Sequence, residues 1–492
     1  MYDAIVIGGG PNGLVAASYL AGAGRGRGRR VLVLERGAGE ADVSPDAGWV
    51  PAAVVKDLTL ERFGWTHPAH DPWLTIPLAP GGVLELRRDV AASAEAIRRV
   101  SPADAARWPE FCARMTRLAR FLERLYLAPP PNPTGGSLAD LVTLGGLARR
   151  ARRLGREGIT DLLRTFPMSV GELLDDWFES DALKGALGAI GVRNLCQGPR
   201  SGGTAFVLLH HHVGSPPGVF DAGSGNVCTA LVAAARDRGI ELRHSADVVR
   251  VLTRGERAMG VALASGEEIE GRAILSSADP RRTFLELVDQ DLLPPEFRHA
   301  VANIKFRGAR AVISLVLSAR PPFQTLFVAP SLEYVERAYD DAKYARVSAQ
   351  PVLEARYIGA GADGRHRVRA YAQYAPYKLR SGPWSQPERQ ALADTVVEAL
   401  TLHVPALAGA VLERTVLAPP DLKEAYGLTE GHLYHGELTL DQILFMRPVP
   451  GWARYRTPVP GLYLCGAGAH PGGGIIGAAG YNAARVVLRD TL

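Results

Sequence analysis

The chain has few cysteines, and none stands close to another. Only four occur in 492 residues, Cys112, Cys196, Cys228 and Cys465, with no CxxC or CxxxxC spacing. This excludes the redox dithiol of a disulfide-reducing flavoenzyme and a cysteine-based zinc site, because both need neighbouring thiols. Separated cysteines are typical of free thiols in a reducing compartment. We therefore expect no disulfide and no metal site.

Long apolar runs and a strong charge of one sign are also missing. No apolar stretch approaches the roughly 18 residues that span a bilayer, and the run "DAIVIGG" begins too early to follow a secretory signal. A formal charge of +5, from 56 basic and 51 acidic residues, does not indicate nucleic-acid binding in a chain of this length. We expect a cytoplasmic globular protein of two or three domains.

The first 36 residues contain the pattern of a dinucleotide-binding unit. An apolar run, 4–7, precedes glycines at 8, 10 and 13, which form G-x-G-x-x-G. These glycines permit a tight turn, a close approach of pyrophosphate and close packing of a helix on the strand. A helix of small residues follows, and a second apolar run, 31–34, ends in Glu35. We expect the Glu35 carboxylate to accept hydrogen bonds from both ribose hydroxyls.

Two further stretches near this pattern are interpreted without a cofactor role. Gly359, Gly361 and Gly364 repeat the glycine spacing, but an alternating run follows them, so they predict a hairpin loop. The arginine-rich stretch 22–30 comes after the first helix, at the end remote from the phosphates. It is interpreted as a solvated loop, with contact to an anionic partner or membrane as the alternative.

The C-terminus contains a second strand, turn and helix. The strand 462–465 enters a glycine-dense turn, and a helix of small residues begins near Ile476. Its N-terminus and that of the first helix would direct free N–H groups at one ligand. This arrangement suits FAD, with the pyrophosphate at one end and the flavin at the other. No second nucleotide fingerprint indicates a separate nicotinamide domain.

Three segments resemble the phytoene-desaturase-like flavoproteins. They are "DAIVIGGGPNGLVAASYL", "GPRSGGTAFVLLHHHVG" and "GHLYHGELTLDQILFMRPVPGWARYRTPVPGLYLCGAGAHPGGGIIGAAGYNAAR". The nearest branch includes pyridine nucleotide-disulphide oxidoreductase domain-containing proteins and oxygenase-type carotene ketolases. The resemblance covers nearly the whole chain. It implies an α/β fold like that of the amine oxidases, in which a Rossmann-like FAD-binding domain is interleaved with an α+β substrate domain, and it implies non-covalent FAD.

The resemblance also implies which residues bind the cofactor. They are Gly8, Gly10, Pro11, Asn12, Gly13, Glu35, Arg36, Val248, Gly466, Ala467, His470, Ile476, Gly477 and Ala478. The chain departs from the family pattern in two places. No glycine pair follows Glu35 and Arg36 until Gly81 and Gly82, and "PPGVFDAGSGNVCTAL" lacks the usual methionine-containing glycine segment. Carotenoid chemistry therefore does not transfer with the resemblance.

The expected domains alternate along the chain. Residues 1–88, 206–290 and 441–492 are expected in the FAD-binding domain, residues 89–205 in a helical substrate region, and residues 291–440 in an antiparallel-sheet substrate domain. The alternation of residues 305–375 predicts that sheet, and Ser101-Pro102 predicts a helix start. The basic stretch 147–158 is a solvated helix face or a membrane-surface patch. We expect the active site at the domain interface.

Three residues are candidates for the chemistry. His435 and Glu437 in "LYHGE" share a face if extended, and either is a candidate base for the proton that leaves with a hydride. Arg447 is a candidate for binding a substrate anion. The alternative is that all three are hydrogen-bonded architecture. The run 210–212 of three histidines is interpreted as structural, because neighbours on a strand point to opposite faces.

These patterns predict an FAD-dependent oxidoreductase that removes hydride from a C–C or C–N bond of a small molecule, with apolar substrates included. Its electrons would pass to oxygen or a quinone-like acceptor, and a peripheral membrane contact fits the basic stretches. A redox-neutral flavin isomerase or a ketolase is the first alternative. A flavin-binding scaffold without turnover is the second.

Overall fold

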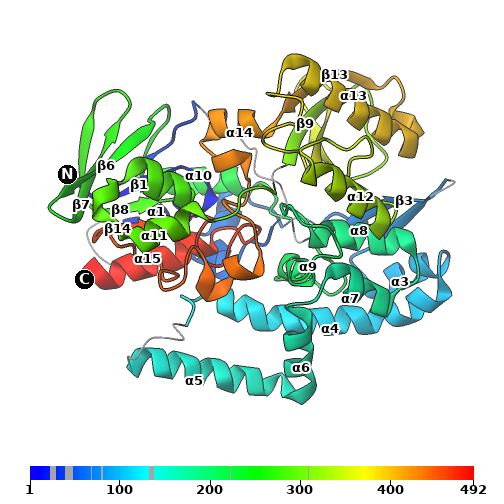
Figure 1. Cartoon of the computed structure of the whole chain (residues 1–492), viewed down its shortest axis with the longest axis horizontal. Helices are drawn as coiled ribbons and strands as arrows, with labels where there is room; N and C mark the ends of the chain where they lie inside the picture. The colour runs from blue at the N-terminus through cyan, green and yellow to red at the C-terminus, as the bar shows by residue number, and fades with distance from the viewer. Residues whose placement is uncertain are drawn as a thin grey trace.

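The structure is a computed structural model that describes residues 1–22, 29–38, 48–67, 69–78, 81–131, 138–221, 223–308 and 310–491. The arginine-rich stretch 23–28 and most of the segment after Arg36 lie outside the described residues. Two seven-stranded sheets organise the chain, one at each end of the molecule (Figure 1).

The first sheet has the order β5-β2-β1-β8-β7-β6, with β14 paired to β8. In its parallel part, strands that are far apart in the sequence are neighbours: β1 pairs with both β2 and β8, and β14 pairs with β8. β6, β7 and β8 form an antiparallel meander. The strands are β1 (Tyr2–Ile7), β2 (Val31–Leu34), β5 (Glu241–Arg243), β6 (Val248–Arg254), β7 (Arg257–Leu263), β8 (Glu268–Ser276) and β14 (Leu462–Leu464).

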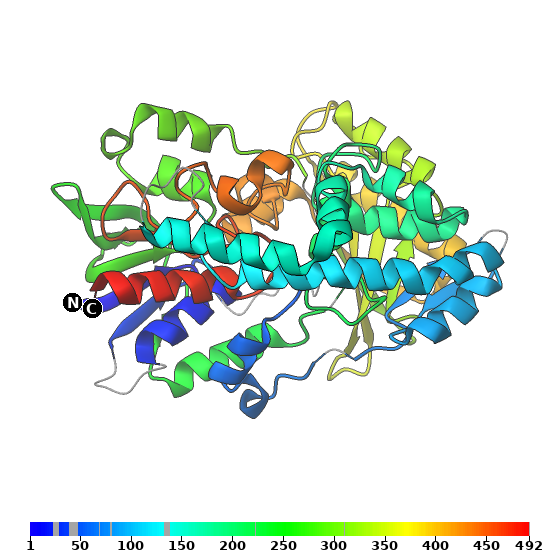
Figure 2. The same cartoon turned by 90° about the horizontal axis from the view of Figure 1, so that it is seen from below.

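Small residues let the terminal helices pack closely beside this sheet. α1 (Pro11–Gly22) lies against α15 (Ala478–Thr491), and α10 (Val227–Asp237) also contacts α1. A Cβ on Gly480 would lie 2.0 Å from the carbonyl oxygen of Asn12, so only glycine permits this approach. Both chain termini consequently lie at the end of the molecule that holds the first sheet (Figure 1 and Figure 2). The remaining helices of this half are α2 (Ala52–Asp57) and α11 (Pro295–Ala302).

The second sheet has the order β13-β9-β12-β11-β10-β3-β4 and is antiparallel except where β10 meets β3. The glycine repeat near Gly361 forms the hairpin between β11 and β12, as predicted. Alternate residues of β9 pack toward α13 (Gln386–His403), which explains the period-two pattern. The strands are β3 (Leu74–Pro77), β4 (Val83–Leu86), β9 (Arg310–Leu317), β10 (Thr325–Val328), β11 (Leu353–Ala360), β12 (His366–Gln373) and β13 (Val411–Leu417).

A helical layer packs on the second sheet. α4 begins at the predicted cap, where the Ser101 side chain accepts a hydrogen bond from the Asp104 N–H at 3.1 Å. Away from this layer, α5 and α6 extend from the body (Figure 1). Besides α13, the helices of this half of the molecule, inside and outside the layer, are α3 (Val90–Arg98), α4 (Pro102–Tyr126), α5 (Leu138–Arg153), α6 (Gly155–Thr165), α7 (Val170–Trp177), α8 (Asp181–Gly191), α9 (Thr204–His212), α12 (Leu332–Lys343) and α14 (Pro419–Tyr426). No helix in the described ranges is long and apolar enough to cross a membrane.

Several segments lie elsewhere than the expected ranges. β3 and β4, inside residues 1–88, pair with the second sheet, because β3 adds to the edge of β10. The histidine run lies in α9 and not in a strand, and this helix packs in the helical layer. Residues 293–306 pack with the first sheet's core. The chain therefore crosses between the two halves more often than the expected residue ranges imply.

Candidate functional site

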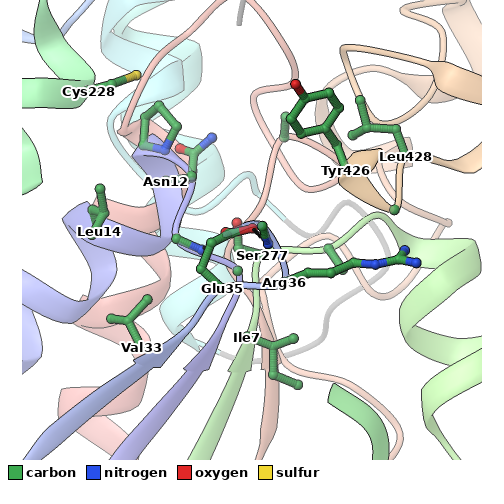
Figure 3. A pocket seen from close by; sticks show the side chains of 18 of the residues that line it. Ile7, Asn12, Leu14, Val33, Glu35, Arg36, Cys228, Ser277, Tyr426 and Leu428 are labelled. Carbon is green, nitrogen blue, oxygen red and sulfur yellow. Dashed lines mark hydrogen bonds between the residues drawn. The ribbon is translucent and has the colours of Figure 1, made fainter. Parts of the chain in front are cut away.

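A cleft of about 350 Å³ runs from the ends of the parallel strands toward the second sheet. Figure 3 shows Glu35 and Ser277 above the strand ends, with Asn12 on one side and Tyr426 and Leu428 on the other. Ten of the predicted site residues line it: Gly8, Gly10, Pro11, Asn12, Glu35, Arg36, Val248, His435, Ala467 and Ile476. The cleft therefore joins segments from both ends of the chain.

The glycine turn has the geometry that a pyrophosphate needs. Gly8 has a positive φ of 94°, and a Cβ on Gly13 would lie 2.1 Å from the Gly8 carbonyl oxygen. A Cβ on Gly10, in contrast, would meet nothing within 4 Å, so its backbone is open to the cleft. The N-terminus of α1 begins directly after this turn. These residues fit a dinucleotide, with Gly13 supporting the turn from outside the cleft lining.

The acidic residue after β2 holds the same turn. Glu35 Oε2 accepts a hydrogen bond from the Gly9 N–H at 2.6 Å, and Oε1 accepts one from the Gly37 N–H at 2.9 Å. Its neighbour Arg36 forms an ion pair with Asp247, 3.5 Å from Nε to Oδ2. The carboxylate thus faces the cleft at the place where a ribose would lie.

The C-terminal turn divides into residues that line the cleft and residues that support it. Ala467 and Ile476 line it, whereas a Cβ on Gly466 would lie 2.2 Å from the Ser277 carbonyl oxygen. Gly477 and Ala478 pack at the start of α15 and do not line the cleft. The turn packs tightly against the residues that follow β8, so only part of it is left to line the cleft.

His470 also lies outside the lining. Its Nε2 is 3.1 Å from the Leu125 carbonyl oxygen, and burial lowers the pKa of its imidazole to about 4. The neutral ring therefore donates to α4 and joins the C-terminal turn to the helical layer. This hydrogen bond uses Nε2 alone, and Nδ1 has no hydrogen-bond partner among the described residues, so the flavin contact stays a prediction.

His435 and Glu437 do not share a face. His435 has a φ of 56°, in the left-handed region, so the chain turns there and is not extended. His435 lines the cleft, and burial lowers the pKa of its imidazole, with the Arg447 charge lowering it further and Asp279 opposing this shift. Its Nδ1 has no hydrogen-bond partner among the described residues. Of the two candidate bases, only His435 reaches the cleft.

Glu437 is fully buried and has a complete set of partners. Its Oε2 accepts a hydrogen bond from the Cys196 N–H at 3.0 Å, and its Oε1 accepts one from the Arg307 N–H at 3.0 Å. Arg307 Nε lies 3.3 Å from the same oxygen. The carboxylate therefore ties "LYHGE" to the segments after α8 and before β9.

Arg447 is fully buried and binds main-chain carbonyls. Its guanidinium donates to the carbonyl oxygens of Tyr434 at 2.8 Å, Ala467 at 2.8 Å and Glu437 at 3.2 Å. Burial lowers the pKa of Arg447 to about 9, so it remains charged at neutral pH. The N–H groups of Arg447 are therefore used by carbonyl oxygens of the "LYHGE" segment and of the C-terminal turn, and the buried guanidinium is not open to a substrate anion.

Sequence patterns missed Tyr434, which lines the cleft one residue before His435. Its hydroxyl is buried and has no hydrogen-bond partner among the described residues. His211 lies beside it, with ring centroids 5.9 Å apart. The position of Tyr434 in the "LYHGE" motif was the available signal, but its orientation depends on the turn at His435.

The histidine run is structural in its contacts. His210 lies 2.8 Å from both the Tyr126 hydroxyl and the Gly473 carbonyl oxygen. His212 lies 3.0 Å from the Thr116 hydroxyl and 2.6 Å from the Val219 carbonyl oxygen. Within the described ranges, no group of His, Cys, Asp and Glu is arranged to hold a metal ion. All four cysteines are free thiols, as predicted.

Comparison with known proteins agrees with this geometry. The model of the family described as flavin containing amine oxidoreductase matches residues 52–488. Pyridine nucleotide-disulfide oxidoreductase domain-containing protein 2 of Mus musculus is 34% identical over 99% of this chain and 94% of its own length. Hydroxyneurosporene desaturase of Cereibacter sphaeroides is 26% identical over 99% of this chain and 97% of its own length.

A solved structure shows the same fold. Wild-type putrescine oxidase bound to putrescine has a TM-score of 0.59 and 15% identity, covering 100% of this chain and 99% of its own. The predicted resemblance, the predicted fold and the FAD cofactor are confirmed. The chain belongs to the flavin containing amine oxidoreductase family and is an FAD-dependent oxidoreductase.

Proposed function

We propose that the protein removes a hydride and a proton from a C–C or C–N bond of a small molecule and passes the electrons to oxygen or a quinone-like acceptor. The observation that carries this proposal is the continuous cleft between the glycine turn and His435. One end has the geometry of a dinucleotide site. The other end has a neutral imidazole at the boundary of the two halves.

The residues that would hold FAD lie along the cleft. Gly8, Gly10 and the start of α1 would bind the pyrophosphate, and Glu35 would bind the ribose. The wall formed by Ala467 and Ile476 would lie toward the flavin. Bound FAD supplies the acceptor for the hydride.

His435 is the side chain proposed to accept the proton. Burial keeps its imidazole neutral at pH 7, and the unpartnered Nδ1 is available for a proton. Asp279 also lines the cleft, and its charge would stabilise the imidazolium once the proton has been taken up. General-base catalysis of this kind contributes roughly 10²–10⁴-fold to a rate.

Two observations favour this reaction class. One relative is a hydroxyneurosporene desaturase and one protein of the same fold is a putrescine oxidase, so carbon-carbon and carbon-nitrogen bonds are the proposed targets. The described residues contain one dinucleotide-binding unit, so a nicotinamide acceptor has no second domain of this kind to bind. Oxygen or a quinone-like molecule is therefore the proposed acceptor.

The test is a spectroscopic titration of the purified protein. We expect a flavin spectrum, release of FAD on denaturation, bleaching by a substrate without oxygen and return of colour in air. A protein that keeps full FAD but is never bleached by candidate donors would support the scaffold alternative. A colourless protein that does not take up added FAD would contradict the cleft assignment.

A further inference from the structure

Five charged side chains are buried together behind the cleft, on the side of the second sheet. They come from the segment after α8, the loop before residue 222 and strands β9 and β11, and each is nine-tenths or more buried. We call them the buried charge cluster. Its members are Arg193, Asp221, Arg310, Glu354 and Arg356.

The cluster is held by short ion pairs. Arg193 Nη2 lies 3.1 Å from Asp221 Oδ2, and its Nε lies 3.2 Å from Glu354 Oε2. Arg310 Nη2 lies 2.7 Å from the same Glu354 oxygen. Arg356 pairs with Glu354 at 2.7 Å and also with Asp221. Asp221 Oδ2 and Glu354 Oε2 are therefore each shared between two arginines, whereas Glu354 Oε1 pairs with Arg356 alone.

The charges of the cluster do not cancel. Three arginines face two carboxylates; the arginines hold the pKa of Glu354 well below its usual range, so Glu354 stays ionised, and Asp221 forms ion pairs with two of them. Arg193 Nη1 and Arg310 Nη1 have no hydrogen-bond partner in the described ranges. An uncompensated buried charge is costly, so a net charge of +1 indicates an anion that is bound during function.

Tyr434 connects the cluster to the cleft. It lines the cleft, and burial raises the pKa of its phenol to about 12; the charges of Arg193 and Arg310 oppose this shift, and those of Glu354 and Asp221 add to it. A Cβ on Gly474, another lining residue, would lie 3.3 Å from the Tyr434 hydroxyl. Arg447 contacts the Tyr434 carbonyl from the other side and adds a second positive charge. The hydroxyl therefore has no hydrogen-bond partner among the described residues and lies within electrostatic reach of a cluster that holds three arginines and two carboxylates.

We infer that the inner end of the cleft, at the Tyr434 hydroxyl, binds a carboxylate group of the substrate and disfavours an ammonium group. This inference rests on the proposed function, in which the cleft also receives the substrate. His211 adds no charge, because burial lowers the pKa of its imidazole well below its usual range. The chain would thus differ in substrate charge from an oxidase that acts on a diamine such as putrescine.

Three six-carbon probes test the inference on the FAD-loaded protein. Hexanoate, hexan-1-ol and hexylammonium share a chain and differ in head-group charge. We expect hexanoate to perturb the flavin absorption saturably and to raise the unfolding temperature, with the other two at least tenfold weaker. Equal or tighter binding of hexylammonium would overturn the inference.

Two substitutions of opposite charge sharpen the test. Arg310→Gln removes the excess positive charge and is expected to weaken hexanoate binding at least tenfold, whereas Glu354→Gln increases that charge and is expected to tighten it. Arg367→Gln on β12 is the matched control, since it removes one exposed arginine that pairs with Asp363. A purely structural cluster would lower thermal stability in both variants without changing hexanoate affinity, which would contradict the inference.

A milder variant and a second readout complete the test. Tyr434→Phe keeps the ring and removes only the hydroxyl, so it remains informative if the charge variants do not fold. We expect it to lose at least tenfold in hexanoate affinity at full FAD occupancy. If Glu354→Gln shifts the flavin reduction potential but not hexanoate binding, the charge serves the reduced cofactor and the inference is wrong. Hexanoate binding in a protein that no donor reduces would contradict only the proposed function.

Discussion

Replacing Glu437 by alanine is expected to destabilise the protein without removing the base of the reaction. The fully buried carboxylate accepts hydrogen bonds from the N–H groups of Cys196 and Arg307, both at 3.0 Å. Leaving a buried donor unpaired costs about 1–3 kcal/mol, so two donors give a loss of about 2–6 kcal/mol. Asp441→Ala is the matched control, because this exposed acid pairs with Lys305 and its loss costs about 0–1 kcal/mol.

The assay combines urea unfolding, FAD occupancy and stopped-flow reduction of the flavin by a substrate that bleaches the native protein. We expect Glu437→Ala to shift the unfolding midpoint strongly, Asp441→Ala to leave it nearly unchanged, and the folded fraction of Glu437→Gln to be reduced at the native rate. A rate loss of roughly 10²–10⁴-fold in Glu437→Gln with unchanged stability would refute this reasoning, since that is the signature of a lost general base.

Four further predictions concern the cleft and its support. Glu35→Ala is expected to weaken FAD binding by about 1.5–3 kcal/mol, measured by titrating the apoprotein, because charge-assisted bonds to the ribose are lost. Gly480→Ala is expected to lower thermal stability and FAD retention, because its Cβ would collide with α1, whereas Gly81→Ala meets nothing within 4 Å and serves as the control. Deleting residues 25–29 is expected to leave the FAD content unchanged, because α1 ends remote from the glycine turn; lost flavin in a folded deletion would contradict this. Flavin reduction is expected to be constant from pH 7 to 9 and to fall only below pH 6.5, because the base His435 has a lowered pKa, and His435→Ala is expected to remove this dependence.

Local patterns were sufficient for the nucleotide half of the protein. β2 has the predicted bounds, 31–34, and the glycine turn, the first helix and Glu35 follow in the predicted order. The reason is that these features depend on neighbours along the chain: a positive φ needs glycine, and a helix packed on a strand needs small residues. The hairpin at Gly361 was predictable for the same reason, because an alternating run identifies a strand.

The roles of the candidate residues at the inner end of the cleft were decided only by the tertiary structure. Spacing placed His435 and Glu437 on one face, but the left-handed turn at His435 separates them. The sequence contains no sign that Arg447 bonds to carbonyls or that the Tyr434 hydroxyl is buried without a partner among the described residues. By itself the sequence determined the family, the cofactor and the glycine turn. Which side chains reach the cleft depended on contacts between segments more than a hundred residues apart, and local periodicity carries no information about such contacts.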